Sequence, residues 1–378
     1  MTPVSSHSPP GRPPLRTVQV LGGGNAGSSA HVRSLAAGLV ARGVRVTVCA
    51  PGEADHTYDF TGAGAAHVHV PRSSDPVSVA ALRAACADAD LVHAHGLHAS
   101  FRAALALSGK HIPLVVTWHN RAHAEGARGH LLRVLERRVV KAAAVVLGTS
   151  SDLVDRARRT GARDARLAAV SLPGPRTAVE RGDPDRQHSK VRAELGAIGR
   201  PLLLAVGSLD RQRGYDLLLD AARAWRELDP APLVVVAGEG PLRAELQGRI
   251  EHEALPVRLA GRRDDVGALL AAADLALLPG GRESRSVLAQ EALHARVPLV
   301  ATAVGGIPEL VGDAAELVPS GDAVAFAAAV VRLLGDPERR QLLRERGVRQ
   351  AATWPTEDET VAQVLSVYDE LTQPRPLI

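Results

Sequence analysis

The sequence is poor in cysteine, in aromatic residues and in long apolar runs, and each shortage excludes a class of protein. Two cysteines in 378 residues cannot build the disulfide framework of a small secreted domain. Three Trp, three Tyr and three Phe are too few for the stacking platforms that bind single-stranded nucleic acid. No apolar run reaches the roughly 18 residues of a membrane span, and residues 1–16 lack the apolar core of a secretory signal. We therefore expect a cytoplasmic protein that binds no nucleic acid.

The positive charge of the chain is small and unevenly distributed. The formal net charge is +4, and only three of the 45 basic residues are Lys, which is typical of high-GC codon usage. Residues 1–174 contain 20 basic and 11 acidic side chains, whereas the remainder contains 25 and 30. The first half is therefore basic and the second half acidic. The excess positive charge is thus relevant to the partner that binds the first half of the chain.

Short β-branched runs alternate with helical stretches along nearly the whole chain. Runs such as LLLAV and LVVVAG are continuously apolar, as in parallel strands that are covered on both faces. Strands are predicted at 17–21, 44–49, 91–95, 114–118, 143–148, 167–170, 201–207, 232–237, 256–260, 275–278, 298–301 and 315–318. Helices are predicted at 28–42, 98–108, 128–142, 214–227, 240–251, 285–295 and 356–372. Repeated βα units predict an α/β protein with two doubly wound parallel sheets.

A stretch rich in Pro and charge separates the two sets of strands. Residues 171–200 have no strand pattern in their first twenty positions, and we place the linker there. The predicted domains are residues 17–174 and 190–355, and the Pro-rich residues 1–16 are predicted to be a disordered tail.

A glycine-rich loop follows strand 17–21. It lies where ligands of an open parallel sheet bind, beyond the carboxyl end of a strand. Backbone N–H groups of such a loop, followed by a helix N-terminus, can approach an anion closely. The loop lacks the full dinucleotide fingerprint with its distant acid. Three interpretations therefore stay open: a phosphate-facing loop that includes Gly23 and Gly24, a plain tight turn, and a nicotinamide site.

Imidazoles lie at the ends of two strands that we expect to be neighbours. His93 and His95 alternate along strand 91–95, and His119 and Asn120 follow strand 114–118. The imidazoles can serve as substrate contacts, as structural hydrogen-bonding groups or as metal ligands. The metal interpretation would make the protein a hydrolase, although the second half of the chain offers no matching His pair.

The second half contains two Glu separated by seven residues. Glu283 follows strand 275–278, and Glu291 lies about two turns inside the next helix. Backbone N–H groups can hold a phosphate where this helix begins, at Ser286, Val287 and Leu288. Each Glu can then bind hydroxyl groups on one side of the phosphate.

A basic residue follows strand 201–207, at the loop that starts with Gly207 and Ser208. Arg213 comes six residues after Gly207, just before a helix. A guanidinium beside a diphosphate stabilises it as a leaving group without a metal ion. The pattern predicts a diphosphate site that uses arginine and backbone amides.

At these residues the chain resembles the family 4 retaining glycosyltransferases, which have the GT-B fold. The resemblance is carried by Glu283–Glu291 with its continuation EALHARVPLVATAVGGIPELV, and by GSLDRQRGYDLLLDAA at 207–222. Further support comes from VVVAGEGPLRAEL, LVHAHG and LAAGLVARGVRVTV. The resemblance implies two Rossmann-like domains that face a central cleft, with the last helix, in residues 356–378, packing back on the first domain.

The resemblance also implies roles for individual residues. Glu283 and His119 match residues that face the transferred sugar, and Glu291 matches the residue that holds the nucleotide ribose. Arg213, Gly23 and Gly24 match residues that face the donor diphosphate, and Arg263 falls where the family packs the nucleotide base. We also assign Ser208 and the helix start at Ser286, Val287 and Leu288 to donor binding. We assign His95 and Asn120 to the acceptor.

The activity implied is transfer of a hexose from a nucleotide-diphosphate sugar to an acceptor with retention of configuration. We expect neither a metal ion nor a cofactor, and a UDP-sugar in preference to GDP-mannose. The acceptor is a small molecule, a lipid-linked molecule or a glycan. Arg133, Arg137 and Lys141 form a stripe on helix 128–142, which is either a solvated face or a peripheral contact with an anionic membrane.

Two segments in the second half of the chain depart from the family pattern. Where the family usually has Arg after the glycine that matches Gly207, this chain has Ser208, and Arg211 is the nearest substitute. The usual Glu-Gly-Phe-Gly run is Glu283-Ser284-Arg285-Ser286. These departures keep a second hypothesis open, that of a binding or scaffold protein that retains the fold without transfer.

Overall fold

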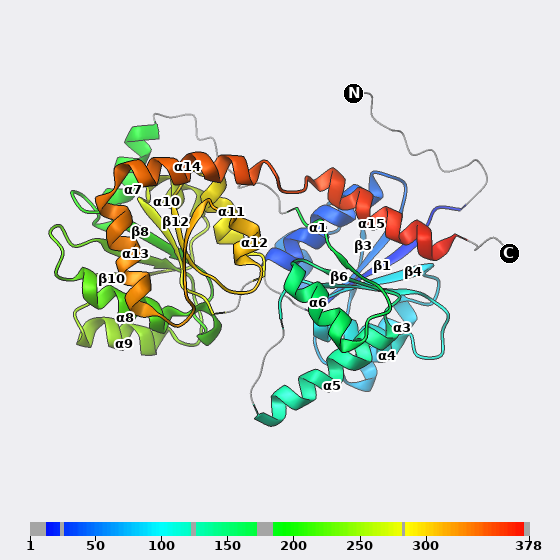
Figure 1. Cartoon of the computed structure of the whole chain (residues 1–378). Helices are drawn as coiled ribbons and strands as arrows, with labels where there is room; N and C mark the ends of the chain where they lie inside the picture. Colours follow the sequence, from blue (N-terminus) through cyan, green and yellow to red (C-terminus); the bar gives the residue numbers. More distant parts are fainter. Residues whose placement is uncertain (1–12, 23–25, 122–125, 172–183, 282–283, 374–378) are drawn as a thin grey trace. The chain divides into compact units, whose positions relative to one another are not determined.

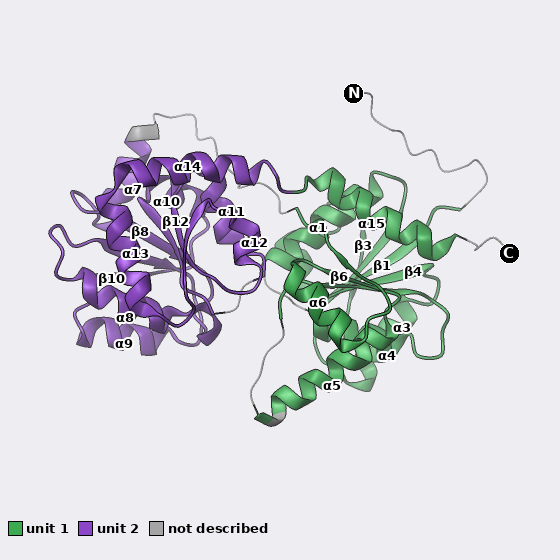
Figure 2. Cartoon of the chain, viewed as in Figure 1, with its two compact units in different colours: residues 1–173, 355–378 green, residues 174–354 purple. Residues whose placement is uncertain are grey.

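The computed structural model describes residues 13–22, 26–121, 126–171, 184–281 and 284–373. The chain divides into two compact units, which Figure 2 colours separately: unit 1 is residues 1–173 and 355–378, and unit 2 is residues 174–354. Most of the expected tail and part of the expected linker lie outside the described residues, in 1–12 and 172–183.

Unit 1 is built on a parallel sheet with the strand order β3-β2-β1-β4-β5-β6-β7 (Figure 1). Its strands are β1 (Arg16–Leu21), β2 (Arg45–Ala50), β3 (Ala66–His69), β4 (Leu91–His95), β5 (Leu114–Trp118), β6 (Val145–Gly148) and β7 (Ala165–Leu167). Its helices are α1 (Ala26–Val40), α2 (Gly52–Tyr58), α3 (Pro76–Ala85), α4 (Leu97–Ala106), α5 (Gly126–Ala142), α6 (Ser151–Thr160) and α15 (Glu357–Thr372).

Alternate side chains of the central strands enter two different cores of unit 1. Val18 and Val20 of β1 pack in a core formed with α3, α4, α5 and α6. Leu21, together with side chains of β2, packs on the opposite face in a core formed with α1 and α15. Because both faces are covered, the strands read as apolar runs and not as alternating patterns.

Unit 2 repeats this architecture with the strand order β10-β9-β8-β11-β12-β13, again entirely parallel. Its strands are β8 (Leu202–Val206), β9 (Leu233–Ala237), β10 (Val257–Gly261), β11 (Leu275–Leu278), β12 (Leu299–Thr302) and β13 (Ala315–Val318). Its helices are α7 (Pro184–Leu195), the 3-10 turn η1 (Arg211–Arg213), α8 (Tyr215–Trp225), α9 (Arg243–His252), α10 (Val266–Ala272), α11 (Val287–His294), α12 (Ile307–Val311), α13 (Ala323–Gly335) and α14 (Pro337–Ala351). Helices α8, α9 and α13 cover one face, and α7, α10, α11 and α12 cover the other.

The predicted α/β class with two doubly wound parallel sheets is confirmed, and three local predictions need correction. Strand β3 was not predicted, because this four-residue edge strand is only partly buried and carries no apolar run. Strand β7 occupies Ala165–Leu167 and not 167–170. Residues 184–195 of the expected linker form α7, whose Val191 and Leu195 pack in the core of unit 2.

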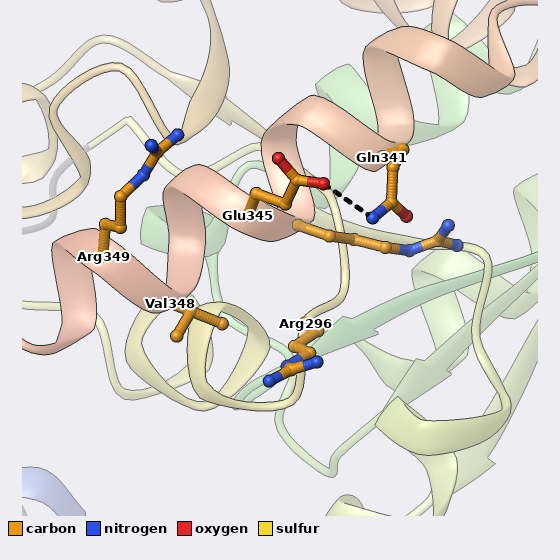
Figure 3. A pocket seen from close by; sticks show the side chains of 6 residues that line it. Arg296, Gln341, Glu345, Val348 and Arg349 are labelled. Carbon is orange, nitrogen blue, oxygen red and sulfur yellow. Dashed lines mark hydrogen bonds between the residues drawn. The ribbon is translucent and has the colours of Figure 1, made fainter.

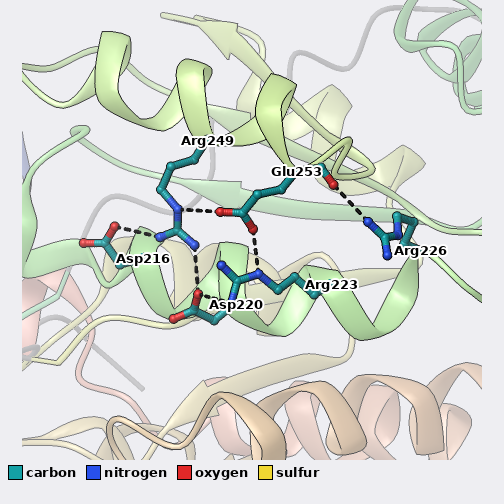
Figure 4. A network of polar contacts seen from close by, with 6 residues as sticks. All are labelled: Asp216, Asp220, Arg223, Arg226, Arg249 and Glu253. Carbon is teal, nitrogen blue, oxygen red and sulfur yellow. Dashed lines mark hydrogen bonds and ion pairs between the residues drawn. The ribbon is translucent and has the colours of Figure 1, made fainter.

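Helices α8 and α9 are joined by a network of ion pairs on the surface of unit 2 (Figure 4). Arg249 contacts Asp216 at 3.2 Å, Asp220 at 2.8 Å and Glu253 at 3.1 Å. Arg223 donates to the second oxygen of Glu253 at 2.6 Å, and this contact is the main cause that lowers the pKa of Glu253 to about 2. Surface ion pairs of this kind each contribute little to the free energy of unfolding. We therefore regard the network as a local contact between two helices.

Candidate functional site

The structure gathers the predicted site residues that it describes in two places, one in each unit. In unit 1 they lie at the carboxyl ends of β4 and β5, which are hydrogen-bonded neighbours. In unit 2 most of them lie at the carboxyl ends of β8 and β11, which are also neighbours, whereas Arg263 follows β10. Both places match the general rule for ligand sites in open parallel sheets.

An imidazole cluster forms the site in unit 1. His95 Nδ1 lies 3.4 Å from His119 Nε2, and the ring centroid of His31, on α1, is 5.8 Å from that of His95 and 5.3 Å from that of His119. His93 stacks on His95 with a centroid distance of 4.3 Å, because residues two apart on a strand share a face. The strand pattern predicted that His95 and His119 would meet, but the contribution of His31 was missed.

The cluster continues into a buried set of polar side chains. His93 Nδ1 lies 2.8 Å from the hydroxyl of Tyr368 on α15, and His93 Nε2 lies 2.7 Å from Thr117 Oγ1. Gln19, on β1, contacts both Tyr368 and His95. Tyr368 and Gln19 were not predicted, because no motif links them to the imidazoles.

Burial keeps these imidazoles neutral. It lowers the pKa of His93 to about 3 and holds the pKa of His95 and His119 well below the usual value, with neighbouring imidazoles acting in the same direction. Neutral imidazoles are hydrogen-bonding groups and potential metal ligands.

His31, His95 and His119 can also be considered as a metal site, because one nitrogen of each lies within 4.8 Å of the others. Tetrahedral zinc with bonds of about 2.0–2.1 Å separates its ligand atoms by about 3.3 Å. The distance of 3.4 Å between His95 and His119 fits that geometry. The predicted set of His93, His95 and His119 needs correction, since both nitrogens of His93 face hydroxyl groups.

The glycine-rich loop is described only in part. Gly23 and Gly24 lie outside the described residues. Below Gly22, the buried guanidinium of Arg102 donates to the carbonyl oxygen of Leu21 at 2.9 Å and to that of Pro71. Arg102 therefore ties the end of β1 to a second loop, and its role was not predicted. Asn120 is exposed directly after His119.

In unit 2 the loops after β8 and β11 are in direct contact. The Gly281 N–H donates to the Gln212 carbonyl at 3.3 Å, and a Cβ on Gly214 would lie 2.1 Å from the Pro279 oxygen. The Arg213 side chain lies next to Gly207, with its Cδ and Nε 3.4 Å from the position of a Cβ there. Arg213 is thereby held where β8 ends.

Helix α11 begins beside these loops. Ser286 is its N-cap, and its hydroxyl accepts from the Ala289 N–H at 3.3 Å. Val287 is half-buried and Leu288 packs in the core, so both residues are fixed against the sheet. Their backbone N–H groups belong to the first turn, where an α-helix offers no partner of its own. Burial raises the pKa of Glu291, one turn further on. Glu283 lies outside the described residues.

Of the residues in unit 2 that depart from the family pattern, Ser208 has a side-chain partner and Arg285 is largely buried. The Ser208 hydroxyl donates to Asp210 at 2.5 Å, and Arg211 pairs with Glu245 at 3.6 Å. Nε and Nη2 of Arg285 are buried without a hydrogen-bond partner, and burial lowers the pKa of Arg285 to about 10. Arg263 forms a two-pronged pair with Asp265, at 2.7 and 2.5 Å.

A surface pocket of about 330 Å³ lies elsewhere on unit 2 (Figure 3). It is lined by Arg296, Gln341, Arg344, Glu345, Val348 and Arg349. Arg296 precedes β12, so the pocket lies at the amino end of a strand, opposite the ligand end of the sheet. We do not assign the nucleotide to it.

Two family profiles match the chain, one in each half. The profile described as Glycosyl transferases group 1 matches residues 188–350, and that described as Glycosyl transferase 4-like domain matches residues 26–173.

Relatives with assigned activities resemble the chain over most of its length. D-inositol 3-phosphate glycosyltransferase from Thermomonospora curvata is 33% identical over 74% of this chain and 71% of its own. Its counterpart from Salinispora tropica is 32% identical over 74% of this chain, which spans 64% of that relative. Alpha-D-kanosaminyltransferase from Streptomyces kanamyceticus is 28% identical, over 69% of this chain and 71% of its own.

Solved structures share the fold. The Anabaena HepE protein in complex with UDP superposes with a TM-score of 0.76 at 19% identity, over 94% of this chain and all of its own. WaaG, a glycosyltransferase of lipopolysaccharide biosynthesis, superposes with a TM-score of 0.70 at 19% identity, over 95% of this chain and 100% of its own. The GT-B fold class, with two Rossmann-like units, is thus confirmed.

Proposed function

Because the chain belongs to the glycosyl transferases group 1 family, we propose that it transfers a hexose from a nucleotide-diphosphate sugar to an acceptor, with retention of configuration. The observation that carries this proposal is the contact between the loops after β8 and β11. It brings the segment of Arg213 against the turn that leads to the N-terminus of α11.

The proposed leaving group is the nucleoside diphosphate. Arg213 supplies a permanent positive charge, and the first turn of α11 supplies N–H groups with the positive end of the helix dipole. Preorganised donors of this kind lower a transition-state barrier by roughly 3 kcal/mol each. Glu291 binds the ribose, and Glu283 and His119 orient the sugar. This chemistry requires neither a covalent intermediate nor a metal ion.

We propose a UDP-sugar as the donor, in preference to GDP-mannose. The proposal is supported by the shared fold of the Anabaena protein, whose structure contains UDP. For the acceptor, a phosphorylated or lipid-linked molecule suits the basic first half of the chain, and one relative is named for an inositol phosphate. His95 and Asn120 are the proposed acceptor contacts.

The test is transfer by Arg213→Ala, with Arg211→Ala as the matched control in the same turn. We expect about a 10²-fold loss of kcat/KM for Arg213→Ala, because one diphosphate contact disappears. Arg211→Ala should stay within a factor of two or three, since its side chain is exposed and paired with Glu245. Unchanged turnover in both Arg213→Ala and Glu283→Ala would refute the assignment.

A binding protein without transfer activity is the second candidate. It is favoured by the pairing of Ser208 with Asp210, since no cation occupies the position where the family usually has Arg. Calorimetry distinguishes the two candidates: a nucleotide sugar that binds tightly but is neither transferred nor hydrolysed supports the binding protein.

A further inference from the structure

A buried chain of hydrogen bonds connects the C-terminal helix of unit 1 to His119. Its members are Gln19 on β1, His93 and His95 on β4, Thr117 on β5 and Tyr368 on α15. Each of these five side chains is less than 5% exposed. Tyr368 is 349 residues away from Gln19 along the chain, yet the Gln19 Nε2 atom lies 2.9 Å from its hydroxyl.

Gln19 gives the chain of hydrogen bonds a direction, because the two ends of a carboxamide are chemically different. Its Nε2 can only donate and its Oε1 can only accept. Nε2 donates to the Tyr368 hydroxyl, and Oε1 lies 3.0 Å from His95 Nε2. His95 must therefore carry its proton on Nε2, which leaves a lone pair on Nδ1 because the ring is neutral.

The next contact transmits this choice to His119. His95 Nδ1 lies 3.4 Å from His119 Nε2, so the lone pair of one ring faces the nitrogen of the other. The contact is attractive only if His119 Nε2 carries the proton. In that case the remaining nitrogen of His119, Nδ1, is an acceptor.

The same reasoning fixes the tautomer of His93, in the second branch of the chain of hydrogen bonds, which runs from Tyr368 through His93 to Thr117. The Tyr368 oxygen accepts from Gln19, so its proton is available for His93 Nδ1 at 2.8 Å. His93 then carries its proton on Nε2 and donates to Thr117 Oγ1 at 2.7 Å. The orientation of one carboxamide thus determines the tautomers of three imidazoles.

We propose that Tyr368 and Gln19 are positioning residues that select the tautomer of His119, with its proton on Nε2 and its Nδ1 free to accept from a substrate hydroxyl. The inference rests on the proposed function only for the identity of that hydroxyl, on the sugar or the acceptor. A flipped Gln19 would reverse every bond and convert His119 Nδ1 into a donor. Tyr368 helps to hold this orientation of Gln19, because its hydroxyl contacts both Gln19 and His93.

The direct test is long-range proton–nitrogen NMR of protein labelled with ¹⁵N-histidine, which reports the protonated nitrogen of each imidazole. Single His substitutions assign the signals. We expect His93, His95 and His119 each to carry their proton on Nε2. A proton on Nδ1 of His119 overturns the proposal, and this readout requires neither donor nor acceptor.

Two matched variants separate positioning from simple stability. Tyr368→Phe removes the hydroxyl at Gln19, and we expect a mixture of His119 tautomers with about a tenfold lower kcat and little change in donor KM. Thr117→Val removes the hydroxyl at the far end of the His93 branch and should leave the His119 tautomer and kcat unchanged. Tyr368→Phe loses the two buried hydrogen bonds of its hydroxyl, and Thr117→Val loses one. Equal losses of kcat would indicate a merely structural role and overturn the proposal.

The failure of this inference can be distinguished from failure of the proposed function. If the unmodified protein transfers no sugar, the proposed function fails while the NMR assignment still stands or falls by itself. If transfer occurs and Tyr368→Phe leaves both the tautomer and kcat unchanged, the positioning role is refuted.

Discussion

Gly214 meets two structural requirements, a positive φ angle and a close approach to the backbone of another loop. Its φ of +69° lies in the left-handed region, and a Cβ would come within 2.1 Å of the Pro279 oxygen. Its small size lets the η1–α8 junction pack against the turn after β11. The position of Arg213, one residue earlier, therefore depends on a glycine.

We predict that Gly214→Ala lowers the free energy of unfolding of the protein by at least about 2 kcal/mol. Strain at positive φ contributes about 1 kcal/mol, and the clash with backbone adds to it. Urea denaturation measures the loss. Gly248→Ala is the control, because Gly248 lies within α9 with open space around it, and there alanine should be neutral or stabilising by up to about 1 kcal/mol. Equal effects of both substitutions would contradict the prediction.

His93 should make stability depend on pH in a defined direction. Its folded-state pKa is depressed to about 3, while an unfolded His titrates near 6.5. Between these values the unfolded chain binds a proton that the folded chain does not, so the stability present above pH 6.5 is lost as the pH falls.

The contribution of this one group is a slope of about 1.4 kcal/mol per pH unit. We predict that His93→Gln reduces the pH dependence of the free energy of unfolding between pH 6 and 5 by about that slope. Urea denaturation at several pH values measures it, and parallel curves for the two proteins would show that His93 is charged in the folded state.

At the scale of elements, helix α5 exposes both cations and apolar side chains. Arg133, Arg137 and Lys141 are exposed on it, as are Leu131 and Val134, which are 57% and 38% accessible. A helix that exposes both cations and apolar side chains suits the interface of an anionic membrane. Among the described helices, none combines the length and the apolarity that a membrane-spanning segment requires.

We predict that the protein binds vesicles containing phosphatidylglycerol more strongly than vesicles of phosphatidylcholine alone. Replacing Arg133, Arg137 and Lys141 with Gln should weaken cosedimentation by about 10²-fold, since each cation near an anionic surface contributes about 1 kcal/mol. The control replaces Arg344 and Arg349 of α14 in unit 2. If binding does not depend on lipid charge, the face is simply solvated.

At the scale of the whole molecule, the C-terminal helix completes the first unit. Val361, Val364 and Val367 of α15 are buried in the core that contains α1 and the strands of unit 1. Gly38 of α1 permits this packing, because a Cβ there would lie 2.4 Å from Val361 Cγ2. Helix α15 therefore belongs to the fold of unit 1.

We predict that Gly38→Ala loosens α15 and leaves unit 2 unaffected. Hydrogen exchange followed by mass spectrometry should be faster in α1, β1 and α15, with unchanged rates in the helices of unit 2. The control is again Gly248→Ala, which should leave the exchange rates of α1, β1 and α15 unchanged. Faster exchange throughout unit 2 as well would show that the two units do not unfold separately.

Much of the fold and part of the site could be predicted from the sequence. Apolar runs located every described strand except β3, which was missed, and β7, which was placed two residues too late, since strands covered on both faces leave a clear signal. The edge strand β3 was missed because partial burial leaves no such run. At the site, spacing along β4 predicted that His93 and His95 share a face, and their centroid distance confirms this.

The sequence alone therefore determined the fold class, the strands that carry site residues and the ends of those strands, because these depend on local periodicity and on the direction of parallel strands. Only the tertiary structure decided that His31 joins His95 and His119, and that Tyr368 meets Gln19. The physical reason is that packing of α1 and α15 on one face of the sheet sets these contacts. No local pattern records which side chain of a distant helix will lie opposite a given strand.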